Sequence, residues 1–248
     1  MSPSPQLTIE QAISQAEKAA EQGNIAIARQ LYSAILQHQP NHPIAIRALR
    51  ELQQELSPHQ SVPAQTADPA PDQINALVNL YHSGQMSPAE QACRELLQTY
   101  PQSLIILNLL GAVLQNQGQL LQAVQVFDKI IQLKPDDAQA YSNRGNALTG
   151  LGQLEEAVDS CNKAIELQPD LAEAYYNHGN ALTELEQLEA AVDSYDQAIR
   201  LKADLALAYY NRGNVLTELG QLEEAVDSYD RAIQLKPDLA QAYSNRGN

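Results

Sequence analysis

Small and apolar residues alternate with polar residues at helical spacing through the second half of the chain. They recur every three or four positions from Tyr141 to Leu151 and again from Leu154 to Ile165. This spacing predicts two α-helices, each with one apolar face. Gly152 separates them, since glycine readily takes the left-handed conformation that ends a helix. Pro169 ends the second helix because its nitrogen has no hydrogen to donate, and we expect Asp170 to cap the next one.

The same pattern returns at a constant interval. Copies begin at Tyr141, Tyr175 and Tyr209, and the first and third copies agree at 25 of 34 positions. A fourth copy opens at Tyr243 with the letters YSNRGN. One helical hairpin cannot bury its apolar face alone, so a repeat of this length predicts hairpins stacked on one another. We therefore expect an all-α fold, an α-solenoid of antiparallel helix pairs.

The recurring positions form a set of an aromatic residue, a glycine, two alanines and a proline. They are Tyr141, Tyr175 and Tyr209; Gly145, Gly179 and Gly213; Ala157, Ala191 and Ala225; Ala164, Ala198 and Ala232; and Pro169 and Pro237. This set resembles the tetratricopeptide repeat family. The copies are similar to the bacterial type and to the repeats of O-linked N-acetylglucosamine transferases. The resemblance implies a right-handed superhelix whose first helices line a concave groove.

One copy departs from this set at two turns. Glu186 stands where its neighbours have Gly152 and Gly220, and Ala203 stands where they have proline. A side chain makes left-handed backbone less favourable than it is for glycine. We therefore expect both turns of this copy to be looser.

More divergent segments precede the regular copies. Residues 1–56 predict a divergent hairpin followed by an additional helix, and the proline-rich residues 57–70 predict an extended linker. Residues 71–248 predict one array, with copies at about 70–103, 104–137, 138–171, 172–205 and 206–239 and an incomplete first helix at 240–248. A terminal repeat normally carries a polar capping helix. The incomplete helix therefore predicts a chain that has been cut short.

Asparagines recur at two positions of each first helix and form what we call the asparagine ladder. It comprises Asn143, Asn146, Asn177, Asn180, Asn211, Asn214, Asn245 and Asn248. We expect it to be flanked by Tyr176, Tyr210, Thr183, Thr217, Glu184 and Glu218. Each ladder position falls at the same place on successive first helices, and a carboxamide complements a peptide group because it both donates and accepts hydrogen bonds. In the transferases that the repeats resemble, the corresponding asparagine grips peptide backbone. The alternative is that these asparagines only pack one repeat on the next.

The charge of the chain restricts its partners. The formal net charge is −15, which disfavours nucleic acids and anionic membranes because both require a basic surface. Some family members clamp acidic peptide tails with groove cations, but Ser142, Tyr176 and Tyr210 occupy the matching places here. We therefore expect a protein or peptide partner that is neutral or basic.

The sequence shows no segment that would direct it to a membrane. Its first residues lack the basic and apolar blocks of a signal peptide, and the longest apolar stretch, 104–114, is too short to span a bilayer. Cys93 and Cys161 fall at equivalent positions two repeats apart, too far for a disulfide, and predict buried core residues. These features predict a cytoplasmic protein.

No motif predicts catalysis, a metal or a cofactor. His38 and His42 straddle Pro40, so they do not share a helical face, and the adjacent Glu155 and Glu156 point apart on a helix. The first hypothesis is therefore a non-enzymatic scaffold that binds an extended or helical peptide segment in the groove. The second is the substrate-presenting region of a larger glycosyltransferase or sulfotransferase. A third is self-association through the last, unpartnered helix.

Overall fold

The computed structural model describes residues 9–21, 25–39, 68–247 and, between 40 and 67, only 42, 44, 45 and 48. The chain divides into two compact units, Met1–Ala64 and Gln65–Asn248. Most of the predicted additional helix before residue 57, most of the predicted linker 57–70, and Asn248 lie outside the described residues.

In the described residues of the first unit, two helices pack against each other. They are α1 (Ile9–Glu21) and α2 (Ile25–His38). Small residues at the contact, Ala16 and Ala28, let the two helices approach, and the buried cluster also includes Ala19, Tyr32, Ile35 and Ala45.

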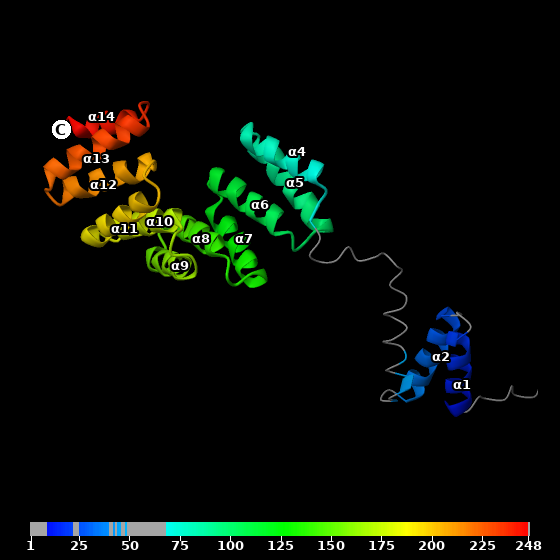
Figure 1. The fold of residues 1–248 in the computed structure, drawn as a ribbon. Helices are drawn as coiled ribbons and strands as arrows, with labels where there is room; N and C mark the ends of the chain where they lie inside the picture. Colours follow the sequence, from blue (N-terminus) through cyan, green and yellow to red (C-terminus); the bar gives the residue numbers. More distant parts are fainter. Residues whose placement is uncertain are drawn as a thin grey trace, which may run out of the picture. The chain divides into compact units, whose positions relative to one another are not determined.

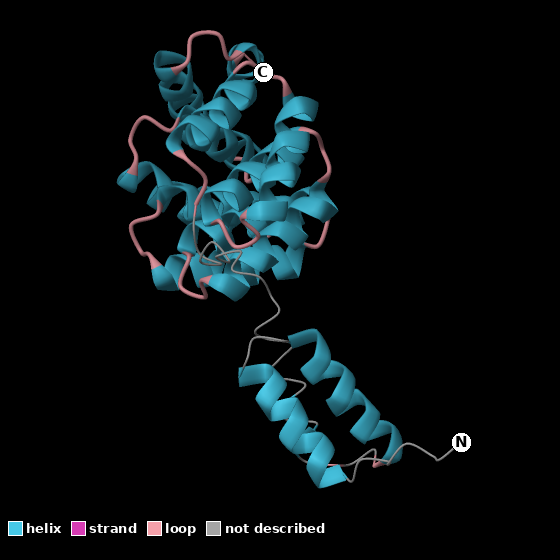
Figure 2. Cartoon of the chain, turned by 90° about the vertical axis from the view of Figure 1, so that its right-hand side faces the viewer, coloured by secondary structure: helices cyan, strands magenta, loops and turns pink. Residues whose placement is uncertain are grey.

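The second unit is a continuous series of helix pairs. Its helices are α4 (Pro71–His82), α5 (Met86–Thr99), α6 (Leu104–Asn116), α7 (Leu120–Leu133), α8 (Ala138–Gly150), α9 (Leu154–Leu167), α10 (Ala172–Glu184), α11 (Leu188–Leu201), α12 (Ala206–Glu218), α13 (Leu222–Leu235) and α14 (Ala240–Arg246). Each packs on the next, and the described residues contain helices, turns and loops but no strand (Figures 1 and 2). This arrangement confirms the predicted α-solenoid.

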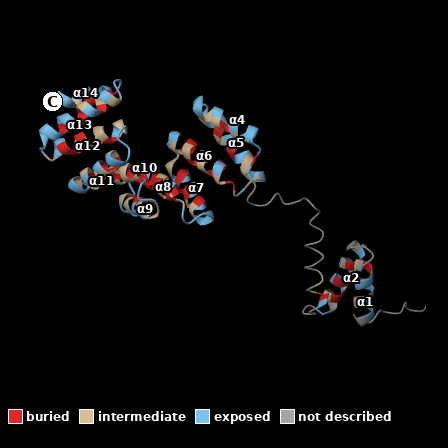
Figure 3. Cartoon of the chain, in the orientation of Figure 1, coloured by how far each residue is buried: buried red, intermediate tan, exposed pale blue. Residues whose placement is uncertain are grey.

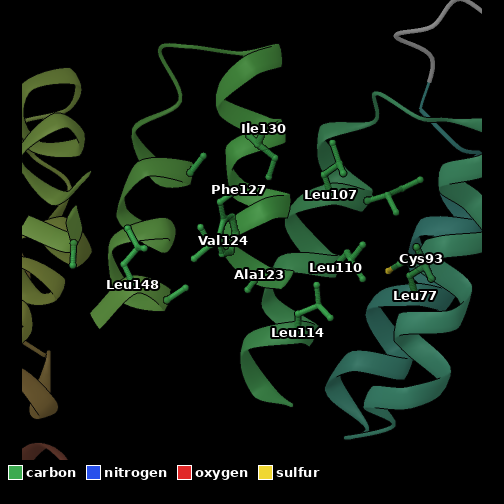
Figure 4. Packing of buried hydrophobic residues seen from close by; sticks show 14 of the residues in the cluster. Leu77, Cys93, Leu107, Leu110, Leu114, Ala123, Val124, Phe127, Ile130 and Leu148 are labelled. Carbon is green, nitrogen blue, oxygen red and sulfur yellow. The ribbon is translucent and has the colours of Figure 1, made fainter. Parts of the chain in front are cut away.

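The period of the sequence is also the period of the structure. From α6 onward the first helices begin at the same interval as the sequence copies, and complete first and second helices have 13 and 14 residues. Buried positions lie where helices face each other, and exposed positions lie on the outer surfaces (Figure 3). One apolar cluster runs from α4 to α10 and includes Leu77, Cys93, Leu107, Phe127 and Leu148 (Figure 4).

Within a helix pair, a glycine of the first helix lies against a side chain of the second helix. A Cβ on Gly179 would lie 2.7 Å from the ring of Tyr195, and a Cβ on Gly213 would lie 2.7 Å from the ring of Tyr229. These distances are below van der Waals contact, so only glycine lets the ring lie against the helix backbone. Phe127 takes the place of the tyrosine opposite Gly111. The glycine in the recurring set is therefore a packing requirement.

Two predictions about the turns are wrong. Glu186 adopts φ 58°, close to the 75° of Gly220, and Gln187 N donates to Leu182 O at 2.9 Å as Gln221 N does to Leu216 O at 2.8 Å. The turn keeps its geometry because Glu186 itself takes the left-handed conformation. The turn around Ala203 also matches its counterpart around Pro237. Leu205 N donates to Lys202 O at 3.2 Å, and Leu239 N donates to Lys236 O at 3.1 Å.

The predicted cap at Asp170 is also wrong. The residue before the first turn of α10 is Leu171, whose side chain is buried and gives no capping hydrogen bond. Of the described helices, only α8 has the expected aspartate cap, with Asp137 Oδ1 accepting from Ala140 N at 3.0 Å. Asp170 lies one residue too early, in the turn itself. At α10, burial of an apolar residue has replaced the capping contact.

An arginine–aspartate pair joins most successive repeats from α7 onward. Arg144 Nε donates to Asp128 Oδ1 at 2.7 Å and Arg212 Nε donates to Asp196 Oδ1 at 2.6 Å, and Arg246 pairs with Asp230 in the same way. Each pair links a first helix to the second helix before it. These pairs were not predicted from the sequence, although in these copies an arginine follows an aspartate at one constant interval.

The junction between α9 and α10 has a different chemistry. Asn162 and His178 stand where the neighbouring junctions have aspartate and arginine, and His178 Nδ1 lies 3.0 Å from Ser194 Oγ. Burial lowers the pKa of His178 below its ordinary value, so the ring is neutral at pH 7. This junction therefore lacks the ion pair that its neighbours share.

Restoring the pair should strengthen this junction. We predict that Asn162→Asp combined with His178→Arg raises the free energy of unfolding by about 0.5–1 kcal/mol more than the sum of the single changes. Denaturant unfolding of the four proteins, followed by circular dichroism, measures this coupling. Additive effects at low salt would contradict the role given to the pair.

Candidate functional site

The asparagine ladder forms hydrogen bonds between successive first helices. Asn211 Nδ2 donates to Asn180 Oδ1 at 2.9 Å and to Tyr176 Oη at 3.3 Å. One repeat later, Asn245 Nδ2 donates to Asn214 Oδ1 at 2.9 Å. The two asparagines of the ladder therefore pair with each other across the boundary between repeats.

Core tyrosines hold the ladder from the second helices. The ring of Tyr195 is buried, and its hydroxyl donates to Asn180 Oδ1 at 2.9 Å and lies 3.1 Å from Thr183 Oγ1. Tyr229 makes the same contacts with Asn214 and Thr217, at 3.0 Å and 3.1 Å. Burial raises the pKa of Tyr195 well above its ordinary value, so its hydroxyl keeps its proton.

These hydroxyls were not among the site residues predicted from the sequence. The available signal was a threonine at the same interval before each tyrosine, Thr183 before Tyr195 and Thr217 before Tyr229. The rings of the tyrosines belong to the core, while their hydroxyls reach the first helices.

The copy at 138–171 lacks this network. Cys161 replaces the core tyrosine and Ser142 replaces Tyr176. Asn177, which is 8% exposed, instead donates through Nδ2 to Ser142 Oγ at 3.0 Å and to Ser142 O at 3.2 Å. Asn146 is exposed, and its side chain makes no hydrogen bond with the described residues. The hydrogen-bond partners of the ladder asparagines therefore differ between the repeat that begins at α8 and the repeat that begins at α10.

Some ladder atoms remain open. Among the described residues, every buried side-chain nitrogen and oxygen has a hydrogen-bond partner. Within the same part of the chain, no protein partner is present for Nδ2 of Asn180, Nδ2 of Asn214 or Oδ1 of Asn211. These atoms therefore face solvent. Asn180, Asn211 and Asn214 therefore each use one half of the carboxamide between the repeats and present the other half to solvent.

Two neighbouring hollows lie along these residues. One, of about 310 Å³, is lined by Thr149, Asn180, Thr183, Glu184, Tyr195, Asn211, Asn214 and Glu218. The other, of about 390 Å³, is lined by Asn214, Thr217, Glu218, Tyr229 and Asn245. They share residues and are related by the repeat, so they form two parts of one groove, which we call the polar groove.

The polar groove includes some of the predicted site residues. Those that line it are Asn180, Asn211, Asn214, Thr183, Thr217, Glu184 and Glu218, and those that do not are Asn143, Asn146, Asn177, Tyr176 and Tyr210. Tyr176 contributes indirectly, since its hydroxyl accepts from Asn211. Asn143 Oδ1 accepts from Gln139 Nε2 at 3.1 Å, on the same helix.

The polar groove carries negative charge. Its lining contains Glu184 and Glu218 but no lysine, arginine or histidine. The arginines of the first helices pair with aspartates of the second helices instead. Among the described residues, neither glutamate forms an ion pair, so both charges are available to a ligand.

The described residues offer no reactive thiol and no metal site. Both cysteines are buried, and burial raises the pKa of Cys93 to about 11 and that of Cys161 to about 12. Both thiols therefore stay protonated at neutral pH. No group of three or more His, Cys, Asp or Glu side chains in this part of the chain could hold a metal ion.

The helix pairs and their period define a helical-repeat protein. Residues 111–152, 179–217 and 213–248 match the family described as TPR repeat, and residues 138–171 match the tetratricopeptide repeat. These matched segments show that the chain contains tetratricopeptide repeats. No curated protein matches the sequence.

Several solved structures share the fold. The chain is similar to MamA 41-end from Desulfovibrio magneticus RS-1, with TM-score 0.57, 23% identity, and coverage of 67% of this chain and 94% of that one. A thermophilic TPR protein of Thermus thermophilus gives TM-score 0.63 and 20% identity, with coverage of 71% of this chain and 96% of that one. YrrB is described as a TPR protein with an unusual peptide-binding site. It gives TM-score 0.53 and 21% identity, with coverage of 73% of this chain and 93% of that one. In the described part of this chain, no helix has the length and apolar character needed to cross a membrane.

The ladder contacts predict different roles for two of its asparagines. Asn211→Ala removes two hydrogen bonds between repeats and should lower the free energy of unfolding by about 1–2 kcal/mol. Asn146→Ala removes none and should leave stability unchanged or slightly raised, since alanine favours helix. Denaturant unfolding compares the two variants. Equal losses would show that the bonds seen for Asn211 do not hold the repeats together.

Proposed function

We propose that this protein is an interaction scaffold whose polar groove binds an extended segment of a partner protein by its backbone. The observation that carries the proposal is the set of open ladder atoms. Asn180 and Asn214 present N–H donors, and Asn211 presents an oxygen acceptor, on successive first helices. A peptide group offers the complementary C=O and N–H.

The spacing of the helices supports an extended ligand. Packed helices lie about 8–10 Å apart, and an extended chain advances about 3.3 Å per residue. Successive ladder positions therefore meet a peptide group about every third residue. Contacts of this kind recognise backbone and leave the ligand's side chains largely unread.

The network behind the ladder supports binding without rearrangement. The oxygen of Asn180 is held by Tyr195 and by Asn211, which fixes the direction of its open N–H group. A donor that is already oriented loses less conformational entropy on binding. The hypothesis of a substrate-presenting region of a larger enzyme would use the same groove and stays a prediction, as does self-association.

The proposal is tested by removing only the open donors. Asn180→Asp and Asn214→Asp keep the oxygen that accepts from tyrosine and from the next asparagine, and lose the N–H group. The probe is a neutral peptide of threonine, valine and serine, about eight residues long, which spans roughly three helices. We expect each change to weaken binding to the full chain about 3- to 10-fold, as for the loss of one hydrogen bond.

The control is Asn162→Asp, which adds the same charge on α9, outside the polar groove. Binding is measured by NMR titration, which also shows where the peptide lies. Shifts centred on the second helices, or equal affinities for groove and control variants, would rule out the proposed mode.

A further inference from the structure

The first hollow of the polar groove places two carboxylates around one space. Glu184 and Glu218 both line the cavity of about 310 Å³, and both are exposed. Arg144 and Arg212, which recur in the first helices, have their guanidinium groups paired with Asp128 and Asp196. Nothing in the lining compensates the two negative charges.

These carboxylates stand where the helix itself disfavours them. Glu184 is the last residue of α10 and Glu218 is the last residue of α12. A helix C-terminus carries partial negative charge, so an acidic side chain there is unfavourable. Gly150 occupies the same position in α8, which shows that the repeat forms without an acid there. The two glutamates therefore serve something other than helix stability.

The hollow offers the ligands and the room for one long side chain. The cavity of about 310 Å³ is many times larger than the space that one water needs. Besides the carboxylates, the lining includes Asn211, whose Oδ1 has no partner among the described residues, and Thr183, whose hydroxyl donates to Gly179 O at 2.8 Å. Carboxylate, carboxamide and hydroxyl oxygens are all acceptors, and a lysine or arginine head group brings only donors.

We propose that this cavity receives a lysine or arginine side chain of the segment bound along the polar groove. The proposal rests on the proposed function, because backbone binding to the ladder brings the side chain to the cavity. The charge of the cavity attracts a cation and repels an acidic side chain. The scaffold is then selective for a basic residue at one position and tolerant elsewhere.

The test compares two peptides that differ in one charge. Both have the neutral threonine, valine and serine sequence, with either lysine or norleucine at the centre, so that the apolar stem is kept and the ammonium is removed. Calorimetric titration of the full chain at low salt should show the lysine peptide binding about 3- to 10-fold more tightly. Added salt should reduce this preference.

The residues are tested by removing the two charges at constant size. Glu184→Gln with Glu218→Gln should abolish the preference for lysine, so that this variant binds the two peptides with equal affinity. The matched control is Glu223→Gln with Glu224→Gln, which changes the net charge equally on α13, outside both hollows. The groove variant should melt at the same or a slightly higher temperature, since it removes acids from helix C-termini.

Each result separates the two proposals. Equal binding of both peptides by the unmodified protein overturns the cation pocket and leaves backbone binding standing. A lysine preference that survives in the groove variant, or disappears in the control, also overturns the pocket. Binding of neither peptide overturns the pocket and the proposed function together.

Discussion

The structure depends on the contact between a second-helix ring and a first-helix glycine. In the repeats that begin at α10 and α12, a tyrosine ring lies against glycine backbone so closely that one added carbon would collide with it. This contact sets the distance between the two helices. It also fixes where the tyrosine hydroxyl emerges, which is beside the asparagines of the first helix. Core packing therefore also positions the polar side chains that line the groove.

The same contact explains why the copies are not equivalent. With Cys161 in place of tyrosine, the hydroxyl is lost, and Asn177 turns to Ser142 of the preceding first helix. The junction that follows Cys161 also has Asn162 and His178 in place of the arginine–aspartate pair. The ladder contacts and the ion pair therefore both change at this junction. The network of asparagine and tyrosine hydrogen bonds is present in the repeats after it and absent from the repeat before it.

Much of the fold could be predicted from the sequence, because the constant repeat interval and the positions of glycine, alanine and proline encode the helix pairs directly. Local exceptions were less predictable. Glu186 accepts left-handed backbone, and Leu171 replaces a polar cap, because burial and hydrogen bonds in the surrounding stack outweigh the preference of one residue. The asparagine ladder was predicted as a series, but its bonds were not. Each joins residues of two different repeats, so its geometry appears only when those repeats are stacked.

The most direct test of this account is Tyr195→Phe combined with Tyr229→Phe, which keeps both rings and removes both hydroxyls. NMR order parameters of the Asn180 and Asn214 side-chain amides are the measurement. We expect the helical fold to remain, because the ring still packs on glycine, and the two amides to become more mobile as they lose a hydrogen bond. Amides as rigid as in the unmodified protein would show that the core does not organise the groove, and would contradict the account.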